Sequence, residues 1–134
     1  MHYIALDFGE KRIGVAGSDS GTVVTPLAII TLQPADDPVK QVVSVLMRYD
    51  PHKIIIGLPL SQDGEMTDSA RRAHVFGEAV QKSFPTCSIH YINEILTTFE
   101  ARQRAGRKTG EAIDDHAAAV ILEQFITEQK KNDQ

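Results

Sequence analysis

YIALDFGEKRIGVAGSD, residues 3–19, is the stretch that decides the fold, because it predicts two apolar strands joined by a polar turn. Side chains alternate along residues 3–8 as they do in a β-strand, and Gly9 supplies the backbone freedom for a turn. Asp7 stands out as a carboxylate at the end of a run that is otherwise apolar. A buried carboxylate is costly unless a cation or several donors compensate it, although Asp also caps turns. Both interpretations of Asp7 are open from this stretch alone.

Length and composition indicate one globular domain spanning residues 1–134. The chain has 42% hydrophobic and 24% charged residues, and no apolar run long enough to span a membrane. A single cysteine, Cys87, excludes an internal disulfide and a cysteine-rich zinc site, so we expect a reduced, cytoplasmic protein. The net charge of −4 argues against a general nucleic-acid coat but not against an enzyme with a local basic patch.

The order of predicted elements is strand, strand, strand, helix, strand, helix, strand, helix. A third strand over residues 23–31 contains Pro26, which is expected at a sheet edge or just before the strand. Asp37 and Pro38 open a helix whose apolar stripe runs from Val39 to Met47. The continuous apolar run 53–58 suits a strand covered on both faces. Four more elements follow: a helix starting at Thr67 or Asp68, a strand over residues 88–93, a short helix over 97–105 and a last helix starting near residue 111.

This order predicts an α/β fold with a five-stranded mixed sheet flanked by helices. Three leading strands form an antiparallel meander, and the helix-linked strands after them pair in parallel through right-handed crossovers. The polar tail, residues 128–134, is expected to be frayed.

Three carboxylates from distant parts of the chain are expected at one edge of this sheet. Asp7 ends the first strand, Glu94 ends the fifth, and Asp114 lies in the first turn of the last helix. Asp19 closes the return strand and is therefore expected at the opposite end, as a turn residue. Clustered carboxylates repel one another unless a cation lies between them, and oxygen ligands suit Mg²⁺ or Mn²⁺. Two such ions about 3.5–4 Å apart are a known arrangement for phosphodiester hydrolysis. Singly, Asp114 could be a helix-dipole partner and Glu94 a solvated strand end.

Four motifs resemble the YqgF (RuvX) family in order along nearly the whole chain. They are DFGEKRIGVA (7–16); GLPL (57–60) with Asp63 and Gly64; EILTT (94–98) with Glu100 and Ala101; and Ile113 and Asp114 with AAAVIL (117–122). The resemblance implies an RNase H-like fold, a relationship to Holliday-junction resolvases, and a metal-dependent nuclease that trims the 5′ end of pre-16S ribosomal RNA. Asp7, Glu94 and Asp114 match the acidic positions of the family.

One departure concerns the residue before Glu94, where the family usually has Asp and this chain has Asn93. Neighbouring strand residues face opposite ways, so only one of the two can face the site. We favour Glu94; if position 93 faced the site, an amide would replace a ligand and metal affinity would fall.

Basic residues flank the expected site along the chain. Candidate phosphate contacts are Lys11 and Arg12 beside Asp7, and Arg102, Arg104, Arg107 and Lys108 between Glu94 and Asp114. A solvated charged loop explains the second group equally well.

The sequence thus favours a nuclease with Mg²⁺ or Mn²⁺ as its cofactor, acting on structured RNA such as pre-16S rRNA or a pre-ribosomal particle. Resolution of branched DNA uses the same chemistry and stays open, as does a non-catalytic binding module in ribosome assembly or transcription. A monomer and a homodimer are both compatible with the sequence.

Overall fold

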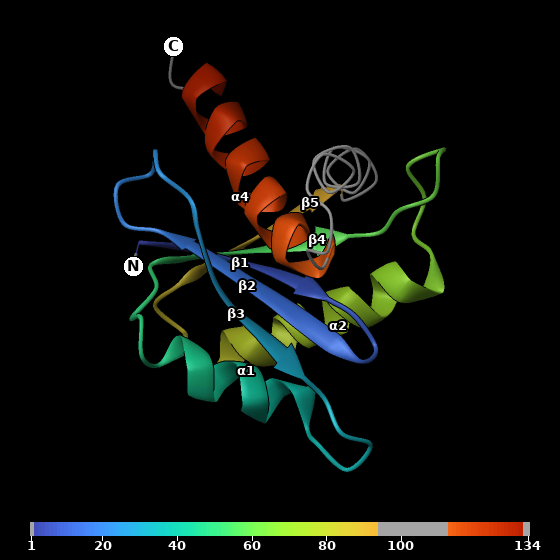
Figure 1. Ribbon diagram of the computed structural model, residues 1–134. Helices are drawn as coiled ribbons and strands as arrows, with labels where there is room; N and C mark the ends of the chain where they lie inside the picture. Colours follow the sequence, from blue (N-terminus) through green and yellow to red (C-terminus); the bar gives the residue numbers. More distant parts are fainter. Residues whose placement is uncertain (1, 94–112, 133–134) are drawn as a thin grey trace.

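The computed structural model describes residues 2–93 and 113–132, which form one mixed sheet covered by helices on both faces (Figure 1). The strands are β1 (Tyr3–Phe8), β2 (Arg12–Ser18), β3 (Thr25–Thr31), β4 (Lys53–Leu58) and β5 (Ser88–Asn93). The helices are α1 (Pro38–Leu46), α2 (Asp68–Ser83) and α4 (Ile113–Asn132). The short helix predicted over residues 97–105 lies outside the described residues.

The sheet has the order β3-β2-β1-β4-β5. β1 pairs with β2, and β2 with β3, in antiparallel fashion, while β1–β4 and β4–β5 are parallel pairs. The predicted meander and the predicted parallel half are therefore confirmed, and β1 and β5 are separated by one strand. Pro26 lies in the edge strand β3, where a missing N–H breaks no inner ladder.

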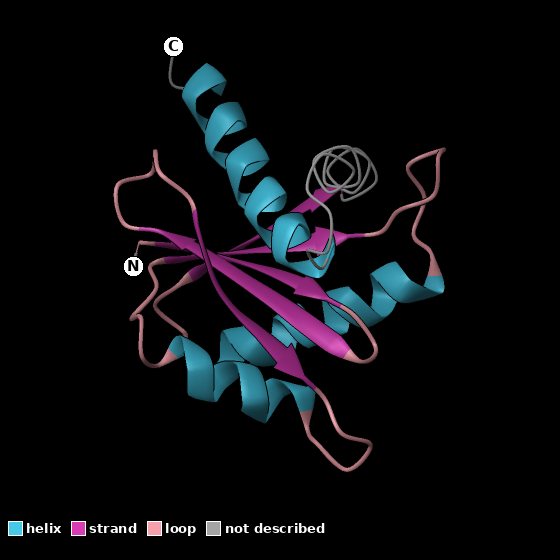
Figure 2. Ribbon diagram, in the orientation of Figure 1, coloured by secondary structure: helices cyan, strands magenta, loops and turns pink. Residues whose placement is uncertain are grey.

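Two apolar layers hold the helices to the sheet. Figure 2 shows α1 and α2 on one face and α4 on the other. Ile54 and Ile56 of β4 pack toward α1 and α2, whereas Ile55 packs toward α4 with Ile121 and Leu122. The apolar run of β4 thus fills both layers, which is the reason it lacks polar alternation.

Side chains cap the starts of α1 and α2, at the predicted cap Asp37 and at Thr67, near which the second helix was expected to begin. Asp37 accepts a hydrogen bond from the Val39 amide at 3.0 Å, and Thr67 accepts one from the Ala70 amide at 3.0 Å. Each bond satisfies one of the amides that a helix N-terminus leaves without an intrahelical partner.

Three details differ from the sequence predictions. Met47 is 70% exposed, because α1 ends at Leu46 and Met47 is its C-cap, at the start of the hydrogen-bonded turn that follows the helix. β3 begins at Thr25 instead of residue 23, since the Ser20 hydroxyl accepts hydrogen bonds from the next amides and holds a turn there. α4 is helical through Asn132, and Lys53 donates to Gln129 at 3.2 Å, so the helix extends into the polar tail for which fraying is predicted.

Among the described residues, no helix combines the length and apolarity that crossing a membrane requires.

Candidate functional site

Asp7 lies on the face of the sheet that α4 covers. Its neighbours of the same parity, Tyr3 and Ala5, pack in the α4 layer, while Leu6 lies in the opposite layer and Phe8 stacks on Phe76 of α2. The Asp7 side chain is half-buried at the carboxyl end of β1. This is the edge at which sites form in α/β sheets of this kind.

Glycines stand beside Asp7 on both neighbouring strands. Asp7 pairs with Gly14 of β2, and the register Leu6–Ile56 puts Gly57 of β4 at the level of Asp7. Neither neighbour has a Cβ, so no side chain of β2 or β4 stands beside Asp7 at this level of the sheet.

The first turn of α4 lies at the same end of the sheet as Asp7. The ring of Phe125 packs edge-on against Tyr3 with centroids 6.1 Å apart, which aligns that part of α4 with the start of β1. Four strand residues from Tyr3 to Asp7 cover about 13 Å, and a helix covers that length in about nine residues. Counting back from Phe125 leads to about residue 116, in the first turn of α4.

Small residues let α4 come close to the sheet near this turn. Ala118 and Ala119 of α4 form a buried cluster with Ala16 of β2. Alanine faces let the backbones of packed elements approach, because no long side chain separates them. The backbone of the first turn of α4 therefore lies toward the edge of the sheet that carries Asp7, and the shared site of Asp7, Glu94 and Asp114 stays a prediction.

Asn93 lies on the other face of the sheet. It shares the parity of Tyr91, which stacks on His74 of α2 with ring centroids 4.6 Å apart, and it pairs with Leu58, a member of the α1–α2 layer. Ile92, between them, packs in the α4 layer. The amide at position 93 is thus not on the face of Asp7. Glu94 lies outside the described residues.

Tyr91 anchors the end of β5 against α2. Burial, with a further contribution from Glu78, raises the pKa of its phenol, so the side chain is neutral at physiological pH. Its hydroxyl lies 3.4 Å from the carbonyl oxygen of His74.

Lys11 and Arg12 are exposed at the β1–β2 turn, beside the Asp7 edge. The turn is closed by a 2.9 Å hydrogen bond from the Gly9 amide to the Arg12 carbonyl, and a Cβ on Gly9 would lie 2.8 Å from that oxygen. Glycine is therefore required here by the close approach. Both basic residues border an open hollow of about 560 Å³ that Thr31 and Gln33 also line.

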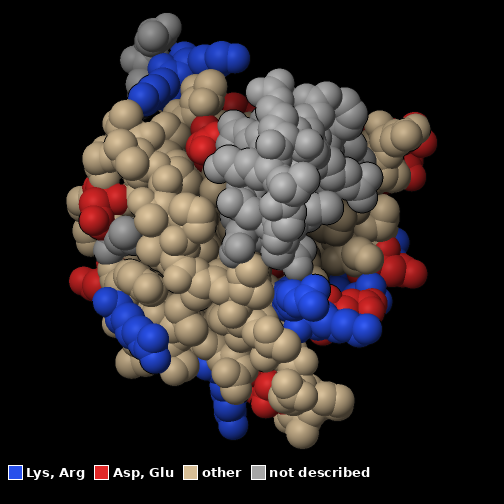
Figure 3. All heavy atoms as spheres, viewed as in Figure 1, with Lys and Arg blue, Asp and Glu red and all other residues tan. Residues whose placement is uncertain are grey.

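The other predicted phosphate contacts, Arg102, Arg104, Arg107 and Lys108, lie outside the described residues. On the face shown in Figure 3, the described Lys and Arg side chains form separate small groups among acidic ones. Asp19 follows Ser18, which pairs with Tyr3, so it lies at the end of the sheet opposite to Asp7, as predicted.

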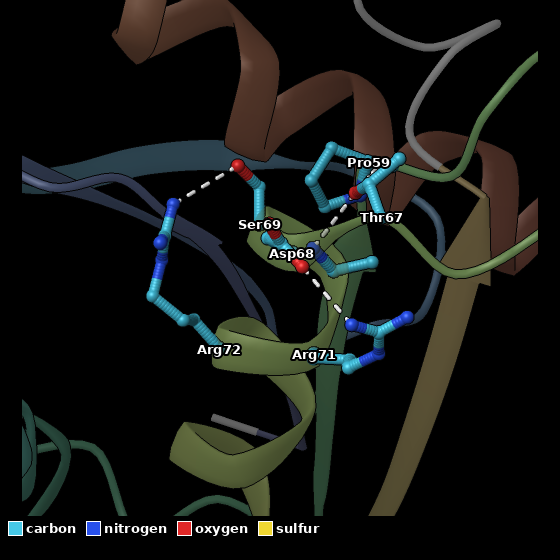
Figure 4. Close-up of polar contacts among 7 residues, drawn as sticks. Pro59, Thr67, Asp68, Ser69, Arg71 and Arg72 are labelled. Atoms are coloured by element: carbon cyan, nitrogen blue, oxygen red, sulfur yellow. Dashed lines mark hydrogen bonds and ion pairs between the residues drawn. The ribbon is translucent and has the colours of Figure 1, made fainter.

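The start of α2 forms a polar network that the sequence analysis missed. Thr67 donates to the Pro59 carbonyl at 2.7 Å, Arg71 contacts Asp68 at 3.0 Å, and Arg72 donates to Ser69 at 3.2 Å (Figure 4). Arg72 also forms a 3.2 Å ion pair with Glu10 of the β1–β2 turn. The network ties the loop after β4 and the turn after Asp7 to α2; nothing local in the sequence signals the pairing of residues so far apart.

Among the side chains that the structure describes, those of residues 2–93 and 117–131, no three His, Cys, Asp or Glu gather closely enough to share a metal ion. The predicted ligand set includes Glu94 and so extends beyond that part of the chain. Its described portion is the Asp7 carboxylate, bounded by glycines and facing the α4 side.

Comparisons with known proteins identify a family, relatives and solved structures that this chain resembles. A family model described as "RuvX: Holliday junction resolvase" matches residues 1–128. A protein of Hydrogenovibrio crunogenus is 35% identical over 124 residues, covering 92% of this chain and 91% of the relative. One of Synechococcus elongatus is 33% identical over 135 residues, covering 96% and 90%. Both are named "Putative pre-16S rRNA nuclease".

Solved structures share the fold at low sequence identity. Thermus thermophilus RuvC in complex with a Holliday junction substrate superposes with a TM-score of 0.57 and 14% identity, covering 96% of this chain and 94% of that one. The Fowlpox virus resolvase bound to Holliday junction DNA gives a TM-score of 0.63 and 11% identity, covering 96% and 99%. The fold is that of RuvC-like resolvases, which is RNase H-like.

Proposed function

Because the chain belongs to the RuvX family, we propose that it is a nuclease that hydrolyses phosphodiester bonds, with the 5′ end of pre-16S rRNA as its substrate. The observation that carries the proposal is the position of Asp7 at the carboxyl edge of β1, on the α4 face and between two glycines. The names of relatives that are 33–35% identical over at least nine-tenths of both chains support the choice of RNA.

The ligands proposed for a divalent cation are Asp7, Glu94 and Asp114. Carboxylate oxygens are the donors that Mg²⁺ and Mn²⁺ prefer, and the strand positions on either side of Asp7 are glycines, which place no apolar side chain beside the carboxylate. The chemistry that a bound pair of ions supplies is activation of a water and stabilisation of the leaving oxygen, at a separation of about 3.5–4 Å.

Glu94 is proposed as the metal ligand in place of position 93, because neighbouring strand residues point to opposite faces of the sheet. Asn93 faces α2, so the next position of an extended chain has the parity of Ile92 and Asp7. β1 and β5 are two strand spacings apart, about 10 Å, and a Glu side chain shortens that gap more than an Asp would.

Lys11 and Arg12, with Arg102, Arg104, Arg107 and Lys108, are proposed to hold the phosphates of the substrate. Contacts of this kind position a nucleic acid without reading its sequence. The proposed enzyme acts in the cytoplasm as a single nuclease domain over residues 1–134, as a monomer or a homodimer.

The test is an Asp7→Asn variant, measured against a matched Asp19→Asn variant at the far end of the sheet. With a purified rRNA precursor and Mg²⁺, we expect the first to lose cleavage by about a hundredfold or more, since metal-stabilised charge is worth several kcal/mol, and the second to retain it. Circular dichroism should show both variants folded. Undiminished cleavage by Asp7→Asn would refute the assignment.

Cleavage of branched DNA is the second candidate, favoured by the description of the family and by the fold shared with junction resolvases. Digesting a four-way DNA junction and the rRNA precursor side by side distinguishes the two, and a resolvase needs two symmetric cuts and hence a dimer. Binding of either substrate without cleavage in any divalent metal would favour a non-catalytic module instead.

A further inference from the structure

An apolar groove of about 410 Å³ lies between α1 and α2, on the opposite face of the sheet from Asp7. Apolar side chains line the groove, apart from two arginines. The lining residues used below are Phe8, Val39, Val75 and Phe76, with Arg71 and Arg72. Val75 is 67% exposed although it lies in the middle of α2 next to the buried Phe76. Single exposed valines are common, but this one extends an apolar surface that is already concave.

Two arginines stand on the rim of the groove. The side chains of Arg71 and Arg72 are 64% and 54% exposed, and each contacts one carboxylate, Asp68 at 3.0 Å and Glu10 at 3.2 Å. A guanidinium has five N–H donors, so both arginines keep donors for a second acceptor. Exposed ion pairs are worth about 1 kcal/mol or less, so they can also be exchanged.

We propose that this groove docks a short linear peptide that inserts one large apolar side chain and sets an adjacent carboxylate on Arg71 or Arg72. The volume fits one or two side chains, whereas a stable interface with a second copy needs about 800 Å² from each partner. Nucleic acid fits poorly, because the ring of Phe76 is 5% exposed and already stacked on Phe8, with centroids 4.5 Å apart.

The groove touches the strand that carries Asp7. Phe8, in its floor, follows Asp7 directly, and the Arg72–Glu10 pair holds the turn after it. Since Asp7 and Phe8 face opposite sides of the sheet, a peptide in the groove and a nucleic acid at the α4 edge can bind together. The groove therefore joins the proposed nuclease site to a protein partner, and its binding can be measured without cleavage.

The experiment titrates the ¹⁵N-labelled full chain with an acetylated, amidated peptide, Asp-Glu-Leu-Phe-Asp, followed by amide chemical shifts. We expect shifts confined to Val39, Arg71, Val75 and their neighbours. Val75→Asp should weaken binding about tenfold, which is the loss of roughly 1.4 kcal/mol of apolar contact. Val23→Asp is the matched control, since Val23 is an exposed valine on the β2–β3 turn at 69%, and it should change nothing.

Control peptides test each half of the proposed motif. Replacing the acids (Asn-Gln-Leu-Phe-Asn) or the apolar pair (Asp-Glu-Ser-Ser-Asp) should each weaken binding, and Arg71→Ala combined with Arg72→Ala should abolish the preference for the acidic form. The proposal is overturned if millimolar peptide causes no shifts at the groove, or if Val23→Asp and Val75→Asp weaken binding equally. Groove shifts that appear on concentrating the protein alone, or on adding an RNA oligonucleotide, would assign the surface to a second copy or to the substrate and overturn it too.

Discussion

Gly77 lies where α2 packs closely against β4 and β5, so Gly77→Ala tests how tightly β5 packs against the helix. A Cβ at this position would lie 2.6 Å from the Tyr91 hydroxyl and 2.7 Å from Cδ1 of Ile56. Ile56 is fully buried, so it has little space to move, whereas the partly exposed Tyr91 can shift. The substitution therefore tests packing at the strand whose end leads to Glu94.

The expected magnitude is the difference between two opposing effects. Alanine gains about 1 kcal/mol over glycine inside a helix. Forcing a methyl group into a packed core costs about 1–3 kcal/mol. The net expectation is a loss of about 1 kcal/mol, which for a chain of 134 residues corresponds to about 4 °C in Tm.

The assay is urea denaturation with a thermodynamic cycle. Tyr91→Phe removes the oxygen nearest the added Cβ, and that oxygen makes only a 3.4 Å contact with His74. Gly77→Ala should therefore cost less in the Tyr91→Phe background than in the wild type. If Gly77→Ala instead stabilises the protein by about 1 kcal/mol, as it would on an exposed helix face, the argument from close packing is wrong.

The remaining predictions concern pH, capping and the proposed ligand. Burial, and then the charge of Lys53, lower the pKa of the His90 imidazole. The unfolded chain therefore binds the proton at a higher pH than the folded chain, and the free energy of unfolding should fall as pH drops below about 6.5. Acid titration of His90→Gln should show a smaller fall in that free energy than the wild type, and an equal fall contradicts the assignment. Thr67→Ala should lower the free energy of unfolding by about 1–2 kcal/mol in urea denaturation, because the N-cap of α2 is lost. An unchanged free energy of unfolding would show that the cap does not stabilise the protein. Glu94→Gln should abolish cleavage while Asn93→Asp leaves the rate unchanged; a faster Asn93→Asp enzyme would put position 93 on the metal side.

Local sequence patterns were sufficient for most of the fold. Side chains in a strand point alternately to the two faces of the sheet. The alternating side chains of residues 3–8 and the unbroken apolar run of β4 therefore identify two strands that differ in burial. Asp37 and Thr67 mark helix starts through side-chain bonds that need only nearby residues. Met47 was misassigned since its burial depends on where α1 stops, which periodicity does not reveal.

Features that depend on register could not be predicted. The glycines beside Asp7 come from β2 and β4, and their level is set by pairing between distant strands. The Arg72–Glu10 pair likewise joins residues 62 positions apart. Chain order predicted that carboxylates meet at one edge, but not which side chains border them or that α1 and α2 share the face opposite to α4.

Alternation in β1 also explains how one strand serves two surfaces. Asp7 and Phe8 are consecutive, so a strand that points the carboxylate at α4 must point the next ring at α2. A shift of β1 by one residue would bury Asp7 against Phe76 and expose Phe8 at the proposed metal site. Two features oppose that shift: the pairing of six β1 residues with β2, and the stacking of Phe8 on Phe76. Both keep Phe8 on the α2 face and Asp7 on the α4 face. A ligand that contacts Phe8 therefore acts on the strand that positions Asp7 without entering the proposed metal site.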